Sequence, residues 1–242
     1  CPMTSLNSVI LRNKVRSSGC NSLSGLCSYE FTLFILISIE FTSSDLITGD
    51  SMQFKCIFIT MFLVSSLFAQ NTLYVSSGGS NTPPYSTWAT AATTIQPAIT
   101  AAATGDIILV DDGTFTLTAN ISITKGVTLR SRNGYLSTTI SGNNVTRCLY
   151  IDHASAVVEG FTIANGYNPS ALNGGFGGGA NIVSGGTIRN CLIRNNQARD
   201  GGGVAIQNNG LVENCVIRNN RADNNNGGGF GGGVRMYSGG IT

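Results

Sequence analysis

The same sequence unit occurs twice in the C-terminal part of the chain. The letters from Gly177 read GGGANIVSGGTIRNCLIRNNQA, and those from Gly201 read GGGVAIQNNGLVENCVIRNNRA. The triple glycine, the Asn-Cys pair and the Ile-Arg-Asn-Asn run recur at one offset, because Cys215 lies 24 positions after Cys191. A fixed period of this length is typical of a solenoid, in which each unit buries its apolar face against its neighbours.

The repeat continues on both sides, with a variable length at one junction. Gly231 restarts the glycine run 30 positions after Gly201, and the segment from Val157 matches the one that begins 30 positions later at Thr187. The additional residues 224–229 are Asn and Gly, as expected for an insertion in a loop. The chain stops partway through a unit, so we expect it to be a C-terminally truncated fragment.

Apolar and polar residues alternate within each unit. In 187–195, Ile188, Cys191 and Ile193 are apolar, while Arg189, Arg194 and Asn195 are polar, and the next unit repeats this arrangement. Short runs of period two that are bounded by Gly and Asn are typical of strands. No stretch after Gly105 has a convincing helical period, and the Leu-x-x-Leu-x-Leu pattern of leucine-rich repeats is absent. The sequence therefore predicts an all-β solenoid.

Successive turns of a β-solenoid stack at the strand spacing of about 4.8 Å, so equivalent residues should lie directly above one another. Asparagine suits corners because it tolerates a left-handed backbone, whereas isoleucine should point inward. The expected ladders are Asn190 with Asn214, Asn195 with Asn219, Cys191 with Cys215 and Ile193 with Ile217. A disordered Gly/Asn-rich tail is the alternative, but disorder would not keep Ile, Val and Cys in register.

Residues 52–69 have the pattern of an export signal. Lys55 supplies the positive charge, an apolar run covers 56–67, and small residues end the segment at Ala69. The apolar core is shorter than the roughly 20 residues of a membrane span, which disfavours the alternative of an anchor. We expect export to the extracellular space or outer cell surface, with no transmembrane span in the mature part. Residues 1–51 are expected to be a disordered leader or a mistranslated extension.

The charge and cysteine content exclude two classes of site. The formal net charge is +2, without the basic stripe that nucleic-acid binding requires. Arg194 and Arg218 are expected to stack as a short basic ladder, which we interpret as a solvated strand face. There is no Cys-x-x-Cys motif, and His153 is the one histidine, so a zinc site is not expected. Cys191 and Cys215 are interpreted as stacked buried thiols at a spacing that allows a bridge.

The segment from Leu73 to Ser131 reads LYVSSGGSNTPPYSTWATAATTIQPAITAAATGDIILVDDGTFTLTANISITKGVTLRS. It resembles the opening of bacterial secreted right-handed parallel β-helix proteins of the pectate-lyase-like superfamily. The later GGGV and NCxIRNN units resemble repeats of polymorphic outer-membrane autotransporter adhesins. The resemblance implies a right-handed parallel β-helix over 107–242, preceded by an N-terminal cap over 70–106.

A short helix over 94–103 is predicted inside that cap. Thr94 can serve as the N-cap, Pro97 lies in the first turn, and Gly105 follows the expected end. Ile95, Ala98, Ile99 and Ala102 form one apolar face. Such a helix would cover the open end of the solenoid and its unpaired strand edge.

Few residues suggest catalysis. Asp152 and His153 are the best candidates for acid–base chemistry, although a lone Asp-His dipeptide is more often a corner. Asp111 and Asp112 are candidates for a metal-binding pair, although next to Gly113 they are more often turn formers. Related lyases and hydrolases use acidic residues, often with calcium.

Two functions follow from these observations. The first is a secreted or surface-displayed, non-catalytic adhesin, stalk or glycan-binding module without a cofactor, with polysaccharide or a host-cell glycan as its partner. The alternative is a polysaccharide lyase or glycoside hydrolase whose active groove lies mostly outside this fragment, and only this alternative allows a calcium ion.

Overall fold

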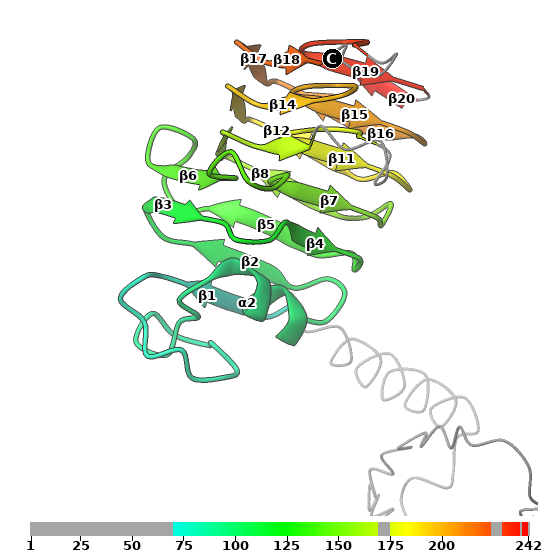
Figure 1. Cartoon of the computed structure of the whole chain (residues 1–242). Helices are drawn as coiled ribbons and strands as arrows, with labels where there is room; N and C mark the ends of the chain where they lie inside the picture. The colour runs from blue at the N-terminus through cyan, green and yellow to red at the C-terminus, as the bar shows by residue number, and fades with distance from the viewer. Residues whose placement is uncertain (1–69, 169–174, 224–228, 238, 242) are drawn as a thin grey trace, which may run out of the picture. The chain divides into compact units, whose positions relative to one another are not determined.

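The computed structural model describes residues 70–168, 175–223, 229–237 and 239–241. They form a parallel β-solenoid of about four turns with one short helix near its N-terminal end, which confirms the predicted fold class (Figure 1). The predicted leader (1–51) and export signal (52–69) lie outside the described residues. In the part of the chain that is described, no helix combines the length and apolar character needed to cross a bilayer.

The strands form four parallel sheets, and within each sheet neighbouring strands come from consecutive turns. The seven-stranded sheet contains β1 (Thr72–Val75), β2 (Ile107–Val110), β5 (Thr128–Ser131), β8 (Val157–Glu159), β12 (Thr187–Arg189), β16 (Gly210–Glu213) and β20 (Gly239–Ile241). The first five-stranded sheet contains β3 (Gly113–Thr116), β6 (Thr138–Ser141), β9 (Thr162–Ala164), β13 (Leu192–Arg194) and β17 (Val216–Arg218). The second contains β4 (Ile121–Ile123), β7 (Leu149–Ile151), β11 (Ala180–Ile182), β15 (Val204–Ile206) and β19 (Val234–Met236). The three-stranded sheet contains β10 (Tyr167–Asn168), β14 (Gln197–Ala198) and β18 (Arg221–Ala222).

The pairing register explains the sequence repeat. Thr187 pairs with Val157 and with Leu211, so two consecutive turns are 30 and 24 positions long, which are the offsets of the repeat. An earlier turn is shorter, because Ile107 pairs with Thr128, 21 positions later. This turn shares no recognisable sequence unit with the later ones, although its strands β2, β3 and β4 join the same three larger sheets.

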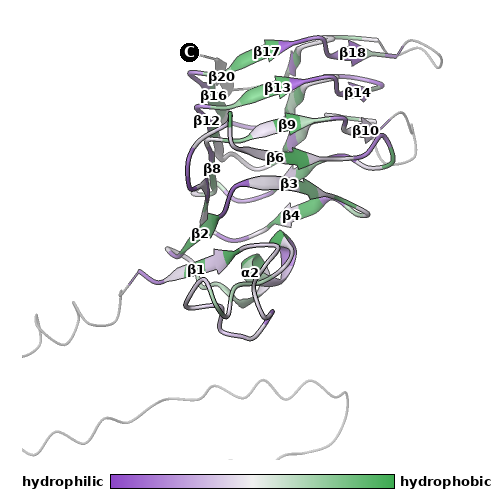
Figure 2. Ribbon diagram, turned by 90° about the vertical axis from the view of Figure 1, so that its left-hand side faces the viewer, coloured by the Kyte–Doolittle hydropathy of each residue, from purple (hydrophilic) through white to green (hydrophobic). Residues whose placement is uncertain are grey.

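Aliphatic residues fill the interior in rows that run along the solenoid axis. In the first five-stranded sheet, Ile140, Ile163 and Ile193 are fully buried and in register, and Ile217 continues the row half-buried. Figure 2 shows apolar colour at equivalent places in the neighbouring strands β13 and β17. Because every second residue of a strand points to the same face, a three-residue strand contributes one such inward residue to this row.

Asparagine occupies left-handed backbone positions at two corners of each repeated turn. The φ angles are 54° at Asn190 and 48° at Asn214 in one corner, and 55° at Asn195 and 56° at Asn219 in the other. Asparagine adopts this conformation more readily than most residues with a β-carbon. At the first corner the side-chain amide of Asn214 also donates a hydrogen bond to the side-chain oxygen of Asn190 in the turn before.

A buried amide ladder adjoins the second corner. Asn196 is 1% exposed, and its side-chain oxygen accepts a 2.7 Å hydrogen bond from the N–H of Gly166. The side-chain nitrogen of Asn196 donates to the carbonyl oxygen of Ile163 at 3.0 Å. One turn later, the side chain of Asn220 donates to the carbonyl oxygen of Ile193 at 2.9 Å and accepts from the backbone of Asn196 at 3.0 Å. These bonds satisfy buried backbone groups where the chain leaves the sheet.

The side-chain bonds between turns at this corner therefore belong to Asn196 and Asn220. Asn195 and Asn219, the pair singled out from the sequence, stack in the preceding position and are exposed. Their part is to provide the left-handed backbone that turns the following amide inward. In each Asn-Asn pair, the first residue thus adopts the left-handed backbone, and the second makes the hydrogen bonds between turns.

The helix α2 (Ile95–Ala101) covers the N-terminal end of the solenoid and packs against β1, β2 and β4. It is shorter than predicted. Thr94 occupies the N-cap position without a side-chain capping bond. Pro97 is the third helical residue and lacks an N–H, which removes one of the two donors that a capping hydroxyl uses.

Two polar side chains complete this end of the fold. Gln96 accepts a hydrogen bond from the backbone N–H of Ser122 at 2.8 Å and donates one to the carbonyl oxygen of Ser122 at 3.2 Å. The glutamine side chain thus pairs with backbone groups of β4, which is the edge strand of its sheet. The ammonium group of Lys125 donates to the carbonyl oxygens of Thr100 and Ala102, each at 2.8 Å. Lys125 therefore closes the helix C-terminus, and the helix ends before Gly105.

Candidate functional site

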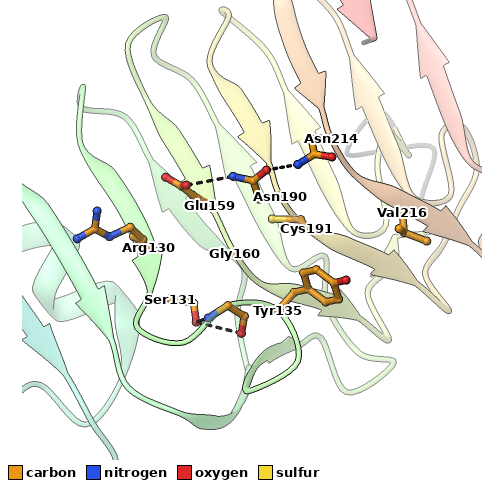
Figure 3. Close-up of a pocket in the computed structure, with 10 residues that line it drawn as sticks. Arg130, Ser131, Tyr135, Glu159, Gly160, Asn190, Cys191, Asn214 and Val216 are labelled. Atoms are coloured by element: carbon orange, nitrogen blue, oxygen red, sulfur yellow. Dashed lines mark hydrogen bonds between the residues drawn. The ribbon is translucent and has the colours of Figure 1, made fainter.

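A groove with a volume of about 480 Å³ follows the corner between the seven-stranded sheet and the first five-stranded sheet (Figure 3). Its lining comes from β5 and the loop after it, from the end of β8, and from the corners that follow β12 and β16. The stacking of turns thus brings together residues that are far apart in the sequence. The groove is the candidate site because it joins a carboxylate, two amides, a guanidinium and an aromatic ring.

One wall is a row of polar side chains at the ends of successive strands. The side-chain nitrogen of Asn190 donates to Glu159 Oε1 at 3.1 Å, and Asn214 donates in turn to Asn190. Arg189 donates to the other oxygen, Glu159 Oε2, at 2.9 Å. Both carboxylate oxygens of Glu159 therefore accept hydrogen bonds from the protein. Along the row, each asparagine amide donates to the side chain of the turn before.

The opposite wall is the loop between β5 and β6, which carries Tyr135. Ser131 Oγ accepts from the N–H of Gly134 at 3.0 Å and donates to Thr138 Oγ1 at 2.7 Å. The hydroxyl of Thr162 donates to the carbonyl oxygen of Tyr135 at 2.7 Å. These bonds hold the backbone of the loop and leave the tyrosine ring, which is 36% exposed, available at the groove.

Asp111 and Asp112, the candidate metal pair, fasten this loop. Asp111 accepts from the guanidinium of Arg132 at 3.1 Å and from the hydroxyl of Ser76 at 3.2 Å. Asp112 accepts from the side chain of Asn133 at 2.9 Å. Burial opposes ionisation of Asp111, but hydrogen bonds from the N–H of Asp112, from Arg132 and from Ser76 outweigh it and lower the pKa of this carboxyl.

The contacts of Asp111 and Asp112 are thus directed to the protein itself. Among the described residues there is no group of three or more His, Cys, Asp or Glu side chains that could hold a metal ion. The arrangement around the pair therefore offers a structural anchor for the loop that lines the groove.

Asp152 and His153, the candidate acid–base pair, form a corner after β7. The N–H of Ser155 donates to His153 Nδ1 at 3.1 Å, and the N–H of Asp152 donates to the carbonyl oxygen of Ile123 at 2.9 Å. Neither residue lines the groove. The structure therefore does not bring this pair together with the polar row of the candidate site.

Arg194 and Arg218 lie in register on the outer face of β13 and β17. Within the described ranges neither guanidinium has an ion pair or hydrogen bond. Like charges that face each other on neighbouring strands repel. The pair is half-buried to exposed, which is the position expected from the sequence for a basic ladder on a strand face.

A buried carboxylate lies on the glycine-rich side of the solenoid. Asp200, with a side chain that is 1% exposed, accepts from Arg235 at 2.6 Å, from Arg199 at 3.1 Å and from the N–H of Phe230 at 3.1 Å. Burial opposes its ionisation, but these three donors together lower the pKa of Asp200. Both carboxylate oxygens of Asp200 accept hydrogen bonds from the protein, so we interpret this cluster as a structural contact between turns.

The residues of the groove were not predicted from the sequence as a group. Glu159 and Asn190 belong to the recognised units, whereas Arg130 and Tyr135 lie in the early turns without a repeat. The signal that could have found them is the strand register: Arg130 pairs with Glu159, which pairs with Arg189 and so lies one turn before Asn190.

Comparisons of the chain with protein-family models, curated proteins and solved structures find no match. The function is therefore inferred from the chemistry of the groove and from the solenoid that forms it.

Proposed function

We propose that this chain is part of a secreted or cell-surface solenoid that binds glycans without transforming them, and that the groove is its binding site. The single observation that carries the proposal is the composition of the groove, in which the Glu159, Asn190 and Asn214 row and the ring of Tyr135 line the same space. Export is supported by the signal pattern of residues 52–69.

The groove suits a ligand that is rich in hydroxyl groups. Amide and carboxylate groups fix the orientation of a ligand through hydrogen bonds, and the tyrosine offers an apolar face with a polar end. Arg130 adds a charged donor that, within the described ranges, has no hydrogen bond or ion pair of its own. A sugar chain combines hydroxyl groups with apolar ring faces, so it matches both walls.

The same geometry disfavours a hydrolase at this place. Glycosidases usually employ a pair of carboxyl groups on either side of the bond that is cleaved. Glu159 is the one carboxylate in the described lining, and Arg189 and Asn190 occupy its two oxygens. A hydrolase would therefore require a groove elsewhere.

Binding is expected to depend on both walls of the groove. Tyr135→Ala removes the ring and keeps the backbone contact with Thr162. Asn214→Gly removes the amide and keeps the left-handed backbone. On an array of neutral and acidic glycans, each substitution should weaken the binding of a captured glycan about tenfold, which corresponds to about 1.4 kcal/mol.

Tyr237→Ala is the matched control, because Tyr237 is an exposed tyrosine outside the groove. It should leave affinity unchanged, and the captured glycan should yield neither new reducing ends nor unsaturated products. Failure to bind any glycan, or an equal loss in all three variants, would contradict the proposal. Product formation would favour the enzymatic alternative.

A further inference from the structure

Two thiols face each other across neighbouring turns of the solenoid. Arg189 pairs with Glu213 and Leu192 pairs with Val216, so the register places Cys191 opposite Cys215. The N–H of Val216 donates to the carbonyl oxygen of Cys191 at 2.9 Å, which fixes the two backbones at this point. Neighbouring strands lie about 4.8 Å apart, within the range of about 4.4–6.8 Å that separates the α-carbons of a disulfide.

The two side chains differ in their surroundings. Cys191 is 1% exposed and lies under the groove, whereas Cys215 is half-buried. Burial raises the pKa of Cys191 well above its usual value, and the hydrogen bond from the Cys191 thiol lowers the pKa of Cys215. The thiolate is the nucleophile in disulfide exchange, so Cys215 is suited to react first and Cys191 to react second.

We propose that Cys191 and Cys215 are an oxidation site, which a low-molecular-weight disulfide converts into a disulfide bond between neighbouring turns. The Cys215 thiolate attacks one sulfur of the reagent, its S–S bond breaks, and one reagent thiolate leaves. This thiolate accepts the proton of Cys191. The Cys191 sulfur then attacks Cys215 and displaces the second reagent thiolate. The two protein thiols are oxidised, and the reagent disulfide is reduced to two thiols.

The bond would fasten the corner that carries the polar row of the groove. Asn190 and Asn214 immediately precede the two cysteines, so a bridge between the cysteines links the backbones that present both amides. It also closes a loop across one whole turn, which limits the unfolded chain. The oxidation itself is independent of whether the groove binds a glycan.

Cys148 provides an internal control. It is fully buried, and burial raises the pKa of its thiol to about 12. The register places Cys148 opposite Asn120 in the turn before and Gly179 in the turn after, so no cysteine lies opposite Cys148. A thiol in such surroundings is expected to react about tenfold or more slowly than Cys215.

The test is to incubate the chain with oxidised glutathione, alkylate the remaining thiols, digest with trypsin and analyse the peptides by mass spectrometry. Cleavage after arginine places Cys191 in the peptide 190–194 and Cys215 in the peptide 200–218. The expected product is these two peptides joined by a disulfide, with Cys148 alkylated. The oxidised chain should also unfold at a higher urea concentration, and dithiothreitol should reverse that shift.

Two substitutions separate the steps. In Cys191→Ser, glutathione should remain attached to Cys215, because no second thiol displaces it. In Cys215→Ser, Cys191 should stay reduced. Circular dichroism verifies that each variant keeps its strands. Glutathione retained on Cys215 of the unsubstituted chain, or modification of Cys148 as fast as that of Cys215, would overturn the proposal.

Discussion

Replacing Ile193 with aspartate is expected to lower the free energy of unfolding by at least about 4 kcal/mol, because the change buries a carboxylate without a partner. Ile193 is fully buried and lies in register between Ile163 and Ile217. The loss is comparable to the whole stability of many domains, which is about 5–15 kcal/mol. Urea unfolding followed by circular dichroism measures it.

Arg194→Asp is the matched control for this substitution. Arg194 is the next residue of the same strand and lies on the outer face, where a carboxylate remains hydrated and gains Arg218 as a neighbour. Its effect should stay within about 1 kcal/mol. Similar losses for the two variants would show that Ile193 does not point inward. Ile217→Asp should have an intermediate effect, because Ile217 is half-buried.

The effect of Ile193→Asp should also depend on pH. Burial raises the pKa of an aspartate above its usual value of about 3.9, because it disfavours the charged form. The deficit relative to the unsubstituted protein should therefore be smallest below that pH and grow as the pH rises toward the raised value. A deficit that does not change with pH would indicate a packing defect rather than a buried charge.

Asn196→Ala is expected to cost about 3 kcal/mol, because it leaves two buried backbone groups without hydrogen-bond partners. These groups are the N–H of Gly166 and the carbonyl oxygen of Ile163. The bond from Asn196 to Asn220 in the next turn is lost as well. Urea unfolding gives the magnitude, and hydrogen exchange should show that the amide of Gly166 loses its protection.

The neighbouring substitution Asn195→Gly separates the two parts of the asparagine pair. Glycine adopts the left-handed conformation of Asn195 without strain, and the exposed side chain makes no inter-turn bond in the described structure. A change of less than about 1 kcal/mol is expected. If Asn195→Gly were the more damaging of the two, the buried ladder would have to be assigned to the exposed pair.

The solenoid was predictable because its later turns repeat. Stacked turns place equivalent residues in equivalent surroundings, so Ile193 and Ile217, or Cys191 and Cys215, recur at the length of a turn. The helix was predictable from its apolar face, but its end was not. That end depends on Lys125, which reaches the helix from a later turn, and no local signal reveals such a contact.

The groove could not be derived in the same way. The same holds outside the groove for Asn195 and Asn196, which look alike in the sequence, because only the backbone decides which side chain turns inward. Asp111 and Asp112 suggest a metal pair in the sequence, whereas their contacts with Arg132 and Asn133 emerge only from the folded chain. Tyr135 lies in a turn with no repeated unit, so its position opposite the polar row emerges only from the folded chain.

The stacking of the turns can be tested by backbone nuclear Overhauser contacts of Leu192 in the isotope-labelled chain. Winding in parallel register should give contacts from Leu192 to the strands of Thr162, 30 positions before, and of Val216, 24 positions after. Contacts confined to residues three or four positions away, or to strands of a different register, would contradict a solenoid built from superimposed turns.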